Sequence, residues 1–141
     1  MHDSHDDNIK NVAVCVTGQR DCGQLIRAGR ELADSTGGAL VVMSALPRLY
    51  GQDTARVLEY LYECSAHAGA QMLVMYTNRP FEALTDGFKK HGIGHVLLGE
   101  PRRRSSQMRT RLKGGYPGAK YYALDQSGHA CQTQQLAACA L

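Results

Sequence analysis

Three consecutive arginines and two serines in the segment HVLLGEPRRRSS, residues 95–106, are the best-suited anion-binding residues of this chain. They follow a short apolar run, Val96 to Leu98, which is typical of a buried parallel strand. Gly99 and Pro101 turn the chain, and either serine can cap a helix that starts there. Guanidinium groups bind phosphate in a bidentate manner, and a helix N-terminus presents backbone N–H groups and a favourable dipole. The segment therefore predicts a site for a phosphorylated ligand, such as a nucleotide.

Positive charge is concentrated in the same region. Six basic residues occur there without an acidic residue between them: Arg102, Arg103, Arg104, Arg109, Arg111 and Lys113. The whole chain has a formal net charge of +3, so the rest of it is slightly acidic. This distribution favours a local anionic partner, and no recognised nucleic-acid-reading element accompanies it. A solvated basic helix face is the alternative interpretation.

Other residue groups lack the spacing of a catalytic or metal site. The piece GQRDCGQL, residues 18–25, has the glycine spacing of a P-loop, but Gln24 and Leu25 replace its lysine and hydroxyl residue. The sequence has no nucleophile elbow and no zinc-type spacing of histidines and cysteines. Five cysteines without a CxxC pair indicate thiols in a reducing compartment. We expect no enzymatic activity and no metal site.

Apolar runs and helical periods alternate along the chain, which predicts the fold class. Strands are expected at 11–17, 39–45, 71–76, 95–98 and 120–124, and helices at 22–36, 53–68, 80–91 and 105–113. This alternation predicts an α/β fold, an open parallel sheet with helices on both faces. In such sheets ligands bind beyond the carboxyl ends of the strands, where the winding reverses.

The length of 141 residues predicts one domain. We expect a disordered lead-in at 1–10, the α/β domain at 11–124 and a C-terminal tail at 125–141 that is floppy or docks as a short helix. No apolar run is long enough to span a membrane, and the polar N-terminus is not a secretory signal. These features predict a cytoplasmic protein that does not insert into a membrane.

Two stretches of the chain resemble a known family. The series NVAVCVTGQRDCGQLIRAGRELADSTGGALVVMSAL and the later PFEALTDGFKKHGIGHVLLGEPRRRS are similar to universal stress protein (UspA-like) domains. They are most similar to the variant found in potassium-sensing histidine kinases, and the match covers Lys10 to Leu124. The resemblance implies a Rossmann-like, adenine nucleotide alpha hydrolase-like sheet of five strands in the order 3-2-1-4-5. It also implies a homodimer through the fifth strand and an adenine-nucleotide crevice between strands one and four.

The nucleotide-binding members have an aspartate after strand one and a glycine-rich phosphate loop after strand four. In this sequence Thr17 and Gly18 stand at the position of that aspartate. Gly99 matches the first glycine of the loop, and Arg102 stands where its second glycine would be. Arginine can replace the glycine loop chemically, because its planar fork binds phosphate. The implied nucleotide or phosphate contacts are Thr17, Gly18, Arg20, Gly99, Arg102, Arg103, Arg104, Ser105 and Ser106.

Two functions remain open on this basis. One is a non-enzymatic stress or signalling domain that binds ATP, AMP or a cyclic dinucleotide at the ends of strands one and four. The other is a domain of the same type that binds no nucleotide and acts by dimerisation or by docking to another protein, through its basic turn and apolar tail.

Overall fold

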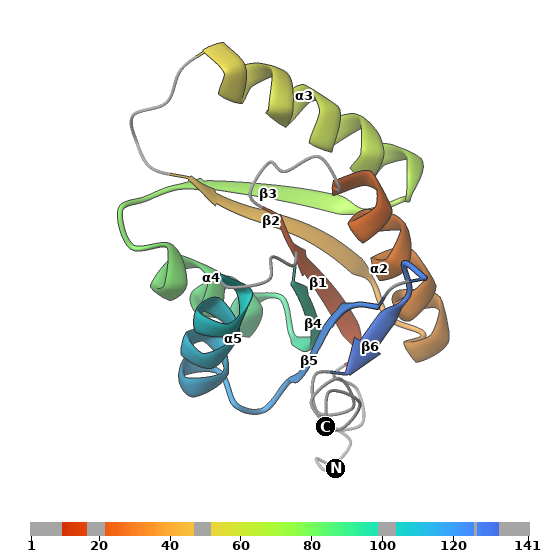
Figure 1. Ribbon diagram of the computed structural model, residues 1–141, viewed down its shortest axis with the longest axis vertical. Helices are drawn as coiled ribbons and strands as arrows, with labels where there is room; N and C mark the ends of the chain where they lie inside the picture. The colour runs from red at the N-terminus through yellow and green to blue at the C-terminus, as the bar shows by residue number, and fades with distance from the viewer. Residues whose placement is uncertain (1–9, 17–21, 47–51, 99–103, 126, 133–141) are drawn as a thin grey trace.

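A six-stranded sheet with helices on both faces makes up the part of the chain that the structure describes (Figure 1). The structure, a computed structural model, describes residues 10–16, 22–46, 52–98, 104–125 and 127–132, with the backbone alone at 52–54 and 104–108. The strands are β1 (Asn11–Cys15), β2 (Leu40–Leu46), β3 (Gln71–Tyr76), β4 (Ile93–Leu98), β5 (Lys120–Leu124) and β6 (Ala130–Gln132). The helices are α2 (Cys22–Thr36), α3 (Gln52–His67), α4 (Pro80–Lys90) and α5 (Arg104–Gly115).

The strands stand in the order β3-β2-β1-β4-β5-β6, and the first five run parallel. The predicted α/β class with helices on both faces is confirmed. The prediction of a wholly parallel five-stranded sheet is wrong, because β6 pairs antiparallel with β5, with Leu124 opposite Ala130. Asp125 makes the connecting turn, since its Oδ1 accepts the backbone N–H groups of Ser127 and His129 at 2.9 Å. Thus part of the stretch interpreted as a tail extends the sheet.

The central strand β1 is buried on both sides. Val12, Ala13 and Val14 are wholly inaccessible to solvent, as the β-branched run NVAVC predicts. One face of the sheet packs against α2 and α3, and the other against α4 and α5 (Figure 1). The helices therefore cover both faces of the sheet that positions the candidate site.

A glycine and a proline that are recognisable in the sequence mark two of the helix ends. Gly37 follows α2 with φ of 79°, a left-handed conformation that glycine adopts without strain, and its N–H donates to the Ala33 carbonyl. Pro80 begins α4, where its missing N–H is tolerated. Helix α5 begins at Arg104, so Ser105 and Ser106 lie inside its first turn and neither is the N-cap that the sequence suggested. Arginine is a good helix former, which explains the earlier start.

Helix α2 approaches the sheet closely at Gly29. A Cβ on Gly29 would overlap the Cγ2 methyl of Val14 and lie 3.1 Å from Leu40 Cδ1. Both neighbours belong to the buried core, so they have little room to move. The absence of a side chain at Gly29 therefore sets the distance between α2 and the sheet.

We predict that Gly29→Ala lowers the free energy of unfolding by about 1–3 kcal/mol, because it overpacks this contact. Gly114→Ala is the matched control, since a Cβ at Gly114 in α5 meets nothing within 4 Å. Alanine favours helix over glycine by about 1 kcal/mol, so the control should be neutral or stabilising. Urea unfolding monitored by circular dichroism measures both, and equal effects of the two changes would contradict the packing argument.

Candidate anion site at the carboxyl edge of the sheet

The ends of β1 and β4 meet at the carboxyl edge of the sheet. Cys15 pairs with Leu98, so the two strands end level with each other. From β1 the chain continues into α2 on one face, and from β4 it continues into α5 on the other. Strand order also reverses here, since β2 and β3 lie on one side and β5 on the other. This edge is the topological switch point where ligands bind in open α/β sheets.

The predicted site residues all belong to the two connections that leave this edge. Thr17, Gly18, Arg20, Gly99, Arg102 and Arg103 lie outside the described residues. Arg104, Ser105 and Ser106 lie in the first turn of α5, where the backbone alone is described. The topology therefore brings the two predicted segments to one edge, while the contacts of their side chains stay predictions.

The basic segment is divided between two environments. Arg104 stands at the N-terminus of α5, whereas Arg111 lies two turns further along that helix. The Arg111 guanidinium lies 4.1 Å from the ring centroid of Phe81 in α4, a cation–π contact that helps to pack α5 on α4. Arg111 is thus a packing residue, and the arginines suited to an anion are those at the N-terminal end of the helix.

A buried hydroxyl at the same edge escaped the sequence interpretation. Ser44 in β2 is 1% exposed, and among the described residues its Oγ has no hydrogen-bond partner. It follows Met43, which pairs with Cys15, so Ser44 lies level with the end of β1. Val42, two residues earlier in β2, packs against α2 and α3. Because side chains alternate between the two faces of a sheet, Ser44 lies on the same face as Val42. The serine that interrupts the apolar run LVVMSAL was the available signal.

Other site types find no support in the part of the chain that the structure describes. It contains no cluster of three or more histidine, cysteine or acidic residues able to hold a metal ion. None of its described helices is long and apolar enough to cross a bilayer. The histidine- and aspartate-bearing lead-in at 1–9 falls outside this description.

The doubly wound architecture with a switch point at β1 and β4 defines the class of fold. Three solved structures share it, each with 14–15% sequence identity to this chain. A universal stress protein family member from Burkholderia pseudomallei matches with a TM-score of 0.60, over 82% of this chain and 95% of its own. UspA from Lactobacillus plantarum matches with a TM-score of 0.52, over 80% of this chain and 95% of its own. A universal stress protein in complex with cAMP matches with a TM-score of 0.51, over 81% of this chain and 93% of its own.

The chain therefore has the fold of the universal stress proteins, as the resemblance in sequence implied. No model of a known protein family matches the sequence, and no curated protein matches it. The closer likeness to the histidine-kinase variant stays a prediction.

We predict that Ser44→Ala leaves the free energy of unfolding unchanged or raises it by up to about 1 kcal/mol, because the hydroxyl is buried without a partner. Tyr121→Phe is the contrasting change, since Tyr121 Oη donates to the Tyr116 carbonyl at 2.7 Å. Removing that partnered hydroxyl should cost about 1–2 kcal/mol. Urea unfolding of both variants tests the assignment, and a comparable loss from Ser44→Ala would show that its hydroxyl is bonded.

Proposed function

We propose that this protein is a non-enzymatic regulatory domain that binds an adenine nucleotide or a cyclic nucleotide or dinucleotide at the switch point between β1 and β4. The observation that carries the proposal is topological. The connection holding Thr17, Gly18 and Arg20 and the connection holding Gly99, Arg102 and Arg103 leave adjacent strands at the same edge. Arginine side chains and the first turn of α5 would then face one volume, and each favours phosphate oxygens.

Three further observations support this proposal. The first turn of α5 follows the basic run directly and contains Ser105 and Ser106, whose hydroxyls can donate to phosphate. Ser44 supplies a buried hydroxyl without a described partner at the same edge. A solved structure of the same fold is a complex with cAMP, so this architecture accommodates a nucleotide in at least one protein.

We predict that one nucleotide among ATP, AMP, cyclic AMP and a cyclic dinucleotide raises Tm by several degrees. Ligand at ~100 times its Kd stabilises a folded protein by about 2.7 kcal/mol. Arg103→Ala combined with Arg104→Ala should abolish the shift. The matched control is Lys89→Ala with Lys90→Ala, which removes equal charge from the last turn of a different helix, α4, where both lysines are exposed.

The controls for this experiment separate three outcomes. A nucleotide-specific shift that the arginine variant loses and the lysine variant keeps supports the proposal. If inorganic phosphate raises Tm as much as the nucleotide does, the site binds anions in general and is not specific for a nucleotide. If no nucleotide shifts Tm at millimolar concentration, the nucleotide proposal is wrong.

A second function is favoured by the surface around β3 and α3. Three tyrosines remain exposed there, Tyr60 and Tyr76 at 45% and Tyr62 at 65%. Edge strand β3, QMLVMY, contains no charged residue and no proline to prevent pairing with another chain. We propose protein interaction, including self-association, as the alternative role. The implied homodimer through β5 stays a prediction, and in this structure β6 occupies that edge.

If the protein self-associates through β3, Val74→Lys should reduce the oligomer, because it places a charge in an edge strand. Val74 is half-buried and belongs to neither core cluster, so the fold should tolerate the change. Gln132→Lys in β6 is the control at the opposite edge of the sheet. Light scattering coupled to size exclusion gives the mass. A smaller mass for Gln132→Lys alone would assign self-association to the β6 edge instead.

A further inference from the structure

All five lysines of the chain lie at the amino edge of the sheet, where the parallel strands begin. Lys10 directly precedes β1, and Lys120 is the first residue of β5. Lys89 and Lys90 end α4 shortly before β4 begins, and Lys113 lies in the last turn of α5 shortly before β5 begins. The topology of the sheet therefore gathers lysines that are far apart in the sequence at one edge.

Side-chain hydrogen bonds hold the segments of this edge together. Asn11 Nδ2 donates to the His91 carbonyl at 2.9 Å, which joins the start of β1 to the end of α4. Tyr116 Oη donates to the Ile93 carbonyl at 2.6 Å, which joins the end of α5 to the start of β4. The segments that carry the lysines are thus bonded to one another.

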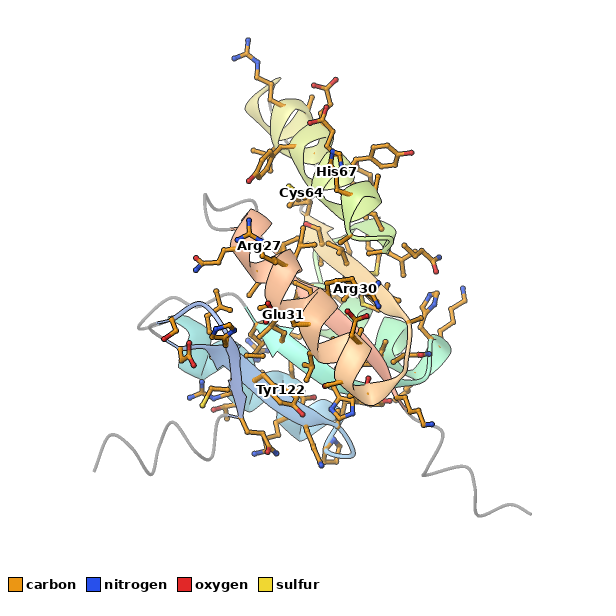
Figure 2. All side chains as sticks on the ribbon, turned by 90° about the vertical axis from the view of Figure 1, so that its right-hand side faces the viewer. Arg27, Arg30, Glu31, Cys64, His67 and Tyr122 are labelled. Atoms are coloured by element: carbon orange, nitrogen blue, oxygen red, sulfur yellow. The ribbon has the colours of Figure 1, made fainter. Side chains whose placement is uncertain are left out.

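The charge of this edge is not balanced by neighbouring acids. All five lysines are exposed, and none of them forms an ion pair with another described residue. Of the carboxylates near the edge, Asp34 is held by Arg30 at 2.9 Å, and Asp86 lies one turn before the end of α4. The outer face of α2 differs, because it mixes charges: Figure 2 shows Glu31 there, and Glu31 contacts His129 at 3.1 Å.

The backbone at this edge does not form a phosphate pocket. Helices α4 and α5 end there, so they direct free carbonyl groups and the negative ends of their dipoles toward it. An anion is therefore attracted by the ends of the lysine side chains, which are hydrated point charges on flexible stems. Such charges suit an extended anionic surface better than a single small anion.

Two features favour a lipid surface over nucleic acid. The exposed large apolar side chains among the described residues lie elsewhere, Tyr60 and Tyr62 on α3 and Tyr76 at the carboxyl end of β3. The amino edge therefore has no described aromatic platform for base stacking. The helices also end at this edge, so none of those described projects from it to enter a groove (Figure 1).

We propose that the amino edge of the sheet docks on the surface of a bilayer that contains anionic lipids. The contact is peripheral, between lysine ammonium groups and lipid headgroups, and it depends on the negative surface potential of the bilayer. The candidate anion site lies at the opposite ends of the strands, so a docked molecule keeps that site away from the bilayer. This inference does not depend on the proposed nucleotide binding.

The experiment is co-sedimentation of the full chain with vesicles of equal parts phosphatidylglycerol and phosphatidylcholine, and with vesicles of phosphatidylcholine alone. The acidic lead-in 1–9 is retained, so its opposing charge is included. We expect binding to the anionic vesicles at low ionic strength, loss of that binding at high salt, and no binding to phosphatidylcholine. Absence of binding to the anionic vesicles at low ionic strength would show that the proposal is wrong.

Two paired variants test whether the amino edge makes the contact. Lys90→Gln with Lys120→Gln should weaken vesicle binding about 25-fold, since each lysine near an anionic surface contributes about fivefold. Arg27→Gln with Arg56→Gln is the matched control, because it removes equal charge from exposed positions near the starts of α2 and α3. Thermal unfolding confirms that each variant folds. Equal losses from the two pairs, or tighter binding to duplex DNA or RNA than to vesicles at the same salt, would overturn the proposal.

Discussion

The pairing of β1 with β4 is the constraint on which the rest of the molecule depends. Both strands are buried in the middle of the sheet, so all their backbone polar groups must be satisfied by neighbouring strands in one register. That register makes Cys15 and Leu98 end at the same level. Helix α2 follows β1 on one face of the sheet, and α5 follows β4 on the other. The candidate site is therefore a consequence of topology before any of its side chains is considered.

Close packing then determines what else lies at this edge. The missing side chain at Gly29 lets α2 lie against Val14 and Leu40. Gly23, nearly two turns earlier in the same helix, leaves room for the Tyr60 hydroxyl, which lies 2.7 Å from the position that a Cβ on Gly23 would take. In this way two glycines on α2 fix the distance of that helix from the sheet and its contact with α3. Helix α3 is thereby held against the end of α2, although Tyr60 itself is 45% exposed.

The sequence allowed the central elements to be predicted, because their signals are local. The run NVAVC, the Pro80 start of α4 and the strand KYYAL need no tertiary information. Strand β6 was missed because three residues, Ala130 to Gln132, have no period of their own and are strand-like only beside β5. Ser44 was missed because its burial depends on register, and Tyr60 because an exposed tyrosine on α3 gives no hint of a contact with Gly23. The arginine cluster is visible in the sequence, but side-chain direction in a connection depends on neighbours that no local pattern encodes.

The two helix N-termini at the carboxyl edge are not equivalent. At α2 the Tyr60 hydroxyl and the Cys64 thiol already lie beside Gly23, 2.7 Å and 3.7 Å from the position that a Cβ on Gly23 would take. An anion there would have to displace this hydroxyl. At α5 the first turn begins with Arg104 and continues with two serines, directly after two further arginines in sequence. The sequence therefore concentrates positive charge on the β4 side, so we expect a bound phosphate to lie at α5 and not at α2.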